Sequence, residues 1–186
     1  DFKDDAELRL EENLLRNACI DGLTGIFNRR HLIKRATEEY SYARRNGLPV
    51  GLIMIDLDRF KQINDTHGHQ MGDFVLNKFA SVINQLKRKE DIFARYGGEE
   101  FVIIPCGQIH MDEVFGFCER IRRAIESSEF RFGDTCIRIT ASFGFHTCKI
   151  TKNEKIESQL NAMIKKADQA LYNAKEKGRN CTEYLL

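Results

Sequence analysis

Two apolar runs around a Gly-Gly step constrain the fold of this chain most strongly. Residues 92–104 place β-branched and aromatic side chains on both sides of Gly97 and Gly98. Glycine adopts the positive φ angles of a tight turn without a steric cost, so this stretch predicts a β-hairpin. Glu99 and Glu100 open the predicted second strand, where only one of the two can face a given site. The pair marks either a solvated hairpin tip or a carboxylate held on a rigid turn that a large ligand can approach.

Length and composition favour one globular domain. The chain has 186 residues, of which 42% are hydrophobic and 31% charged, an ordinary balance for a soluble protein. A net charge of +1 gives no electrostatic footprint for nucleic acid, so no nucleic-acid partner is expected. No apolar run approaches the roughly 20 residues of a membrane span, and no signal peptide opens the chain. Six scattered cysteines without a C-x-x-C pair predict reduced core thiols and a cytoplasmic location.

The remaining segments predict strands and helices in alternation. Helices are expected at 29–46, 74–87, 111–127 and 158–177, and strands at 50–56, 92–96, 99–104, 135–145 and 182–186. Residues 59–73 are expected to form a turn followed by a loop. The order predicts an α/β sandwich with helices packed on a central sheet.

The first 20 residues are expected to be a separate element. They place Leu8, Leu15 and Ala18 at heptad-like spacing but carry little other apolar surface. Residues 1–20 are therefore predicted to be a helical linker or coiled-coil tail that enters from an upstream domain. The chain begins at Asp1 rather than Met, which is the start expected of a fragment.

The strand at 50–56 predicts a metal site. Its continuous apolar run indicates burial on both faces, and it delivers Asp56 to the edge where open sheets bind ligands. If this strand pairs with the hairpin, Asp56 and Glu99 can converge. Two carboxylates and a backbone carbonyl suit Mg²⁺, with substrate phosphates completing its shell. Zinc is disfavoured, because His67 and His69 lack helical i, i+4 spacing and no cysteine is near.

Three cations accompany these carboxylates. Lys61 follows the Asp56 turn, and Lys175 and Arg179 lie four residues apart on one face around the end of the last predicted helix. Such residues either complement the helix dipole and caps or clamp phosphate oxygens. For His69, an ordinary loop histidine and a residue that contacts the ligand are equally good interpretations. The chain has neither the P-loop nor the dinucleotide-binding glycine pattern.

Six blocks of sequence carry a family resemblance. They are Asp21-Gly-Leu-Thr with Asn28-Arg29, Asp56-Leu-Asp-Arg-Phe-Lys-Gln-Ile-Asn-Asp65, Gly68-His-Gln-Met-Gly-Asp73, Arg95-Tyr-Gly-Gly-Glu-Glu-Phe101, Ile139-Thr-Ala-Ser-Phe-Gly144, and Ala167-Asp168 with Ala170-Leu-Tyr172 and Ala174-Lys-Glu-Lys-Gly-Arg-Asn180. In this order they resemble the GGDEF domain of diguanylate cyclases, in its Gly-Gly-Glu-Glu-Phe form. The blocks run from about residue 20 to 181, and residues 21–186 are expected to be the GGDEF catalytic domain. The resemblance implies an α/β fold with a central, mostly antiparallel five-stranded sheet flanked by helices, like that of nucleotide cyclases and polymerase palms. No catalytic position departs from the family's pattern.

The resemblance also implies a reaction and a set of site residues. Two GTP molecules would condense to cyclic di-GMP with release of two pyrophosphates, assisted by two Mg²⁺ ions per active site that Mn²⁺ can replace. The implied metal ligands are Asp56, Glu99 and the Leu57 carbonyl. The implied catalytic groups are Glu99, Lys61 and, as a weaker candidate, Glu100. The implied guanine-binding residues are Asn64, His69 and Asp73. The implied phosphate-binding residues are Phe60, Lys61, Lys175 and Arg179.

The product implies an assembly and a control site. One domain holds one GTP, whereas the ring joins two nucleotides, so a two-fold homodimer with facing half-sites is expected. An upstream sensory domain is expected to act through the N-terminal helix, and it could attach the full-length protein to a membrane. By composition Arg88-Lys-Glu-Asp91 is a solvated turn, but five residues, 92–96, separate Asp91 from Gly97, which is the position of the family's R-x-x-D product-inhibition site. Arg88 and Asp91 are thus implied to bind cyclic di-GMP, with Arg120 or Arg122 as a second contact.

Two rival functions stay open. A non-catalytic module could bind GTP or cyclic di-GMP as a receptor, although such modules commonly lose the signature residues that this chain retains. A cyclase with relaxed base choice would make a mixed cyclic dinucleotide, and Asp73 argues against it because that position faces the base in the family. A purely structural domain would leave the acidic turn and the basic helix end without a shared explanation.

Overall fold

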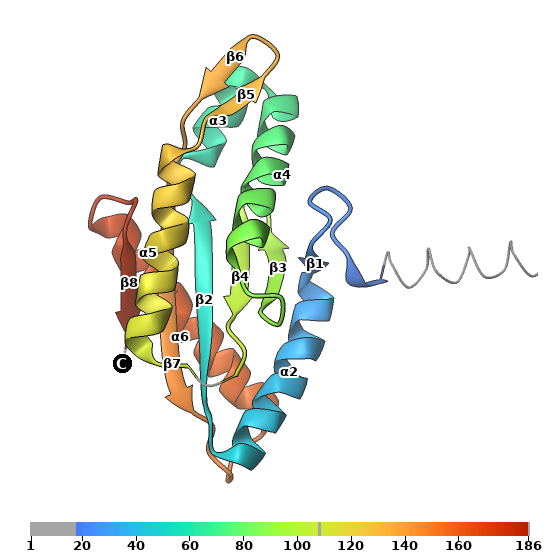
Figure 1. The fold of residues 1–186 in the computed structure, drawn as a ribbon, viewed down its shortest axis with the longest axis vertical. Helices are drawn as coiled ribbons and strands as arrows, with labels where there is room; N and C mark the ends of the chain where they lie inside the picture. The colour runs from blue at the N-terminus through green and yellow to red at the C-terminus, as the bar shows by residue number, and fades with distance from the viewer. Residues whose placement is uncertain (1–17, 108, 186) are drawn as a thin grey trace, which may run out of the picture.

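A six-stranded sheet with helices on both faces forms the body of the protein (Figure 1). The structure is a computed structural model, and it describes residues 18–107 and 109–185. The helices are α2 (Arg29–Asn46), α3 (Phe60–His67), α4 (His69–Leu86), α5 (Met111–Ser127) and α6 (Ile156–Glu176). The sheet has the order β1-β3-β4-β2-β7-β8, and its strands are β1 (Phe27–Asn28), β2 (Pro49–Leu57), β3 (Ile92–Gly97), β4 (Glu100–Ile104), β7 (Ala141–Lys149) and β8 (Thr182–Leu185). A separate two-stranded hairpin is made of β5 (Phe130–Phe132) and β6 (Thr135–Ile137).

The central strand β2 is buried on both faces, as its apolar run predicts. It pairs antiparallel with β4 on one side and with β7 on the other. Alternate side chains enter two separate cores. Ile53 and Ile55 pack against α4 and α5, whereas Leu52 and Met54 pack against α2 and α6. In Figure 1, α5 runs alongside β2, and α6 lies behind the sheet.

Helix α6 lies directly on β7 because one strand residue has no side chain. A Cβ atom at Gly144 would overlap the backbone of Leu171 and the carbonyl of Ala167 in α6. Glycine therefore permits the close approach of strand and helix. This approach determines where the end of α6, with Lys175, lies relative to the end of β2.

The predicted central, mostly antiparallel sheet flanked by helices is confirmed, with one additional strand. The sheet has six strands rather than five, because Phe27–Asn28 adds to the edge as β1, parallel to β3. Two residues are too few to show a strand period in the sequence. The edge strand β8 is also parallel to its neighbour β7.

Two segment predictions were wrong. Residues 59–73 were predicted to be a turn and a loop, but they form α3 and the start of α4, with a break at Gly68 (φ 83°). Only Phe60 of α3 is buried, so the apolar period was too short to detect. The predicted strand at 135–145 is divided between β6 and β7.

The cysteine prediction is confirmed in part. All six cysteines are free, and Cys118 is buried, but Cys136 is exposed on β6. Of the helical tail predicted at residues 1–20, positions 1–17 lie outside the described residues. Among the described residues, no helix is both long and apolar enough to cross a membrane.

Candidate active site

The hairpin forms, with its turn one residue later than predicted. Strand β3 ends at Gly97 and β4 begins at Glu100, so the turn residues are Gly98 (φ 51°) and Glu99. The prediction that both glutamates open the second strand was therefore wrong, because Glu99 belongs to the turn. A register shift between Arg95 and Gly97 accommodates this change. The Glu99 carbonyl accepts a hydrogen bond of 3.4 Å from the Leu57 amide, which ties the turn to the end of β2.

An acidic cluster forms where β2 meets this hairpin. Asp56 lies opposite Glu100 in the β2–β4 ladder, and Asp56 is 7% exposed. Burial raises the pKa of Asp56 to about 6, although Lys175 opposes the shift, and the nearby Glu99 and Glu100 add to it. Burial also raises the pKa of Glu100. The structure thus brings Asp56 and Glu100 together at this edge, and metal binding by Asp56 and Glu99 stays a prediction.

One lysine partly neutralises the cluster. The Lys175 Nζ lies 2.9 Å from Asp56 Oδ2, so the end of α6 reaches the end of β2. Lys175 and Arg179 do not share a helical face, because α6 ends at Glu176 and Arg179 has a left-handed φ of 68°. That prediction was wrong, and Arg179 instead occupies a loop after the helix.

The donor chemistry of this edge fits a divalent cation. The candidate ligands are oxygens of Asp56, Glu99 and the Leu57 backbone, which Mg²⁺ prefers. Within residues 18–107 and 109–185 no group of three or more His, Cys, Asp or Glu side chains has the geometry of a metal site. A small set of protein ligands is typical of Mg²⁺ that is held jointly by carboxylates and substrate phosphates.

An unsatisfied acceptor lies between α3 and α4. Asn64 Oδ1 is buried and accepts no hydrogen bond in the described structure. A Cβ atom at Gly72 of α4 would overlap this oxygen, so glycine provides the space beside it. A buried acceptor without a partner costs about 1–3 kcal/mol, which points to a donor on a ligand. Asp73 is exposed next to Gly72, and His69 is exposed at the first position of α4 rather than in a loop.

The phosphate candidates lie around the start of α3. Phe60 is buried and Lys61 exposed at its first two positions. The preceding residue, Arg59, has a left-handed φ of 58° and gives no side-chain cap to the helix. The first amides of α3 thus have no side-chain partner from the N-cap, an arrangement that favours anions.

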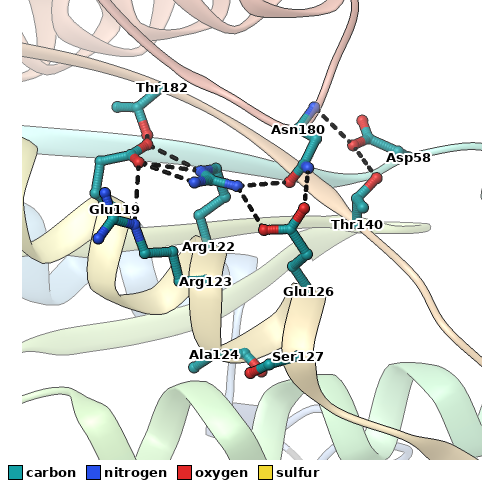
Figure 2. A network of polar contacts seen from close by, with 10 residues as sticks. All are labelled: Asp58, Glu119, Arg122, Arg123, Ala124, Glu126, Ser127, Thr140, Asn180 and Thr182. Atoms are coloured by element: carbon teal, nitrogen blue, oxygen red, sulfur yellow. Dashed lines mark hydrogen bonds and ion pairs between the residues drawn. The ribbon is translucent and has the colours of Figure 1, made fainter.

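One functional residue that the sequence reasoning did not single out is Asp58. Its carboxylate is buried and accepts hydrogen bonds from Thr140 Oγ1 (2.7 Å), Ser142 Oγ (2.7 Å) and the Asn180 amide (3.0 Å). Figure 2 shows Asp58 between Thr140 and Asn180. It fastens the loop that carries Arg179 to the end of β2. The second aspartate of Asp56-Leu-Asp58 was the available signal.

The proposed control residues line a cavity of about 330 Å³. Arg88 and Asp91 face it together with Arg120 of α5. Asp91 is buried, and its two oxygens accept hydrogen bonds from the amides of Arg88 (3.0 Å) and Cys106 (3.1 Å). Of the two candidates for a second contact, Arg120 lies at this cavity, whereas Arg122 is paired with Glu119 and hydrogen-bonded to Asn180 elsewhere.

The fold is a mixed α/β domain with a central sheet flanked by helices and a carboxylate-bearing strand edge. The family profile described as "Diguanylate cyclase, GGDEF domain" matches residues 18–181, and the chain belongs to this family. A curated relative, diguanylate cyclase DgcS of Shewanella oneidensis, is 35% identical over 172 residues, which are 91% of this chain. The match covers 54% of DgcS, so the chain spans about half the length of this relative.

Solved structures show the same architecture. The coiled coil and GGDEF domain of DgcB from Caulobacter crescentus, in complex with c-di-GMP, aligns with a TM-score of 0.85 and 33% identity. The alignment covers 98% of this chain and 96% of that one. The active GGEEF domain of a diguanylate cyclase from Vibrio cholerae aligns with a TM-score of 0.75 and 30% identity, over 84% of this chain and 96% of that one.

Proposed function

We propose that this domain is a diguanylate cyclase that condenses two GTP molecules to cyclic di-GMP and two pyrophosphates. The observation that carries the proposal is the acidic edge of Asp56, Glu99 and Glu100, which is built on a Gly-Gly-Glu-Glu-Phe hairpin and reached by Lys175. The family and the names of the relatives support the same reaction.

Asp56, Glu99 and the Leu57 carbonyl hold the divalent metal, which we propose to be two Mg²⁺ ions replaceable by Mn²⁺. When bound, the metal stabilises charge on the entering and leaving oxygens of the phosphoryl transfer. The 3′-hydroxyl proton passes to a Glu99 carboxylate oxygen or to a water beside it. Glu100 is the weaker candidate for this contact, and its raised pKa suits proton transfer.

The nucleotide lies across α3 and α4 in this proposal. Asn64 Oδ1 and the Asp73 carboxylate accept from the N1–H and N2–H₂ groups of guanine, which adenine lacks. His69 is a third contact near the base. The phosphates contact Phe60, Lys61, Lys175 and Arg179. When GTP binds, the Lys175 ammonium exchanges Asp56 for a phosphate oxygen, so it has an anionic partner both before and after binding.

The assembly is a homodimer whose two half-sites each bring one GTP. A cyclic dinucleotide with identical halves matches a two-fold axis. An upstream sensory domain, connected through residues 1–20, sets the relative position of the two half-sites. The cytoplasm, where GTP is available, is the proposed location.

Cyclic di-GMP inhibits the enzyme at the cavity of Arg88, Asp91 and Arg120. An arginine can fork onto phosphate or onto the Hoogsteen edge of guanine, and two arginines face this 330 Å³ space. Each Asp91 oxygen already accepts one backbone hydrogen bond, and the carboxylate retains lone pairs for a ligand donor.

Incubation of the purified chain with GTP and Mg²⁺, followed by mass identification of the products, tests the proposal. We expect cyclic di-GMP and pyrophosphate, with a rate per subunit that rises with protein concentration. GTP binding without product at high protein concentration would instead support the receptor function.

A further inference from the structure

A second cavity, of about 430 Å³, lies beside the proposed phosphate residues. Its walls come from α3, from residues 137–140 before β7, and from residues 178–180 after α6. In Figure 1, α3 and the β5–β6 hairpin that leads into residues 137–140 lie at the same end of the molecule. Apart from Arg179, the basic residues of this cavity have no role in the proposed reaction.

Positive charge is in excess on these walls. Arg59, Arg138 and Arg179 line the cavity, and none forms an ion pair with a carboxylate in the described part of the chain. The acidic residue on the described walls is Asp58, whose two oxygens already accept three hydrogen bonds. The cavity therefore favours an anion that several arginines can share.

Backbone strain is concentrated on the same walls. Within the described residues, the non-glycine residues with positive φ are Arg59 (58°), Arg179 (68°) and Asn180 (48°), and all three line this cavity. A left-handed conformation costs an L-residue roughly 1–2 kcal/mol. Strain of this kind persists where the surroundings enforce it, and it clusters at ligand-binding sites.

Helix α5 enforces the strained loop through a network that Figure 2 shows. Asn180 Oδ1 accepts from Arg122 Nη1 at 3.0 Å, and Asn180 Nδ2 donates to Glu126 Oε1 at 2.8 Å. The Asn180 amide donates to Asp58 at 3.0 Å. Because Arg122 is only 13% exposed, its bond to Asn180 is partly shielded from water. The loop that presents Arg179 is thus held from both α5 and β2.

We propose that this cavity binds inorganic pyrophosphate through Arg59, Arg138 and Arg179, and that it receives the leaving group of the cyclase reaction. The identity of the anion rests on the proposed function, whereas the excess of arginines does not. At the acidic edge, the bond between the α-phosphorus and its bridging oxygen breaks, and that oxygen leaves with the pyrophosphate. Guanidinium groups suit this anion, because their paired N–H donors match phosphate oxygens. Arg179 connects the two places, since it is also a proposed contact of the GTP phosphates.

Direct binding tests the site without turnover. Pyrophosphate is titrated calorimetrically into the whole chain in EDTA, with no nucleotide present. Loss of one exposed guanidinium contact, in Arg138→Ala, should weaken binding about fivefold. The matched control is Arg131→Ala, on the neighbouring strand β5, which removes an exposed arginine that pairs with Glu129 (3.5 Å) and does not line the cavity. Its affinity should stay within about twofold of the parent. Equal affinity in Arg138→Ala and the parent overturns the proposal.

Product inhibition tests the role in the reaction. In Arg138→Ala, the inhibition constant of pyrophosphate divided by the KM for GTP should rise about fivefold, and Arg131→Ala should not change this ratio. An unchanged ratio in Arg138→Ala means that the cavity does not hold the leaving group. If none of the proteins forms cyclic di-GMP, the proposed function fails, and calorimetry still decides whether the anion site exists.

Discussion

Replacement of Asp56 by asparagine should stabilise the metal-free domain at neutral pH. Burial raises the pKa of Asp56 from 3.8 to about 6, so the folded state binds a proton more tightly than the unfolded chain does between these values. Stability therefore falls as the pH rises from about 4 to 6, and the whole penalty is present above pH 6. At 1.36 kcal/mol per pKa unit, a shift of about 2 units corresponds to about 3 kcal/mol. Solvent screens the repulsion from the half-buried Glu99 and Glu100, which is part of this penalty, so the expected effect is about 2 kcal/mol.

Urea unfolding in EDTA, at pH 4 and at pH 8, measures this effect. At pH 8 the free energy of unfolding of Asp56→Asn should exceed that of the parent by about 2 kcal/mol, and at pH 4 the two should nearly agree. Mg²⁺ should stabilise the parent but not the variant, because the variant lacks a charged ligand. An Asp56→Asn protein that is less stable than the parent at pH 8 would refute the reasoning, since Asp56 would then contribute net stabilisation in its charged form.

Four other substitutions test separate parts of the site. Glu99→Gln should reduce turnover at least 100-fold, because loss of an acid–base contribution has effects on this scale. The thermal unfolding temperature should stay within a few degrees of that of the parent. Near-normal turnover would remove Glu99 from the mechanism. Asp73→Ser should reduce the preference for GTP over ATP, because a site that hydrogen-bonds ligand donors discriminates by roughly 10⁴ against analogues that lack those donors. An unchanged preference would mean that the base is recognised elsewhere. Arg88→Ala should abolish calorimetric binding of cyclic di-GMP with little change in GTP affinity, and equal product affinity contradicts the control site. Asn180→Ala should raise the KM for GTP about tenfold by releasing the Arg179 loop. Asn180→Gly is the comparison, because it removes the same side-chain bonds without strain at the left-handed φ of 48°. KM values equal to that of the parent in both would show that the loop needs no support.

Short-range patterns account for the parts of the fold that were predicted. The apolar run before Asp56 predicts a strand buried on both faces, and β2 is one because sheet neighbours and helices cover it completely. The glycines before Glu99 predict a hairpin for a local steric reason. The ordered motif blocks indicated the family, which the profile match confirms. Roles of individual site residues stay predictions, although the structure brings Asp56, Glu100 and Lys175 together.

The sequence by itself determined the central strand β2, the hairpin strands, the long helices and the acidic residues at one strand end, because backbone preference and amphipathic period act over a few residues. Only the tertiary structure decided which of these residues meet. Asp58 and Asn180 are 122 positions apart, and they bond because β7 and β8 follow β2 in the sheet while α5 packs across its face. The same long-range contacts hold Arg179 in a left-handed conformation that no local propensity favours. The position of the turn at Gly98 and Glu99 was likewise set by pairing with β2, through the bond from Leu57 to Glu99.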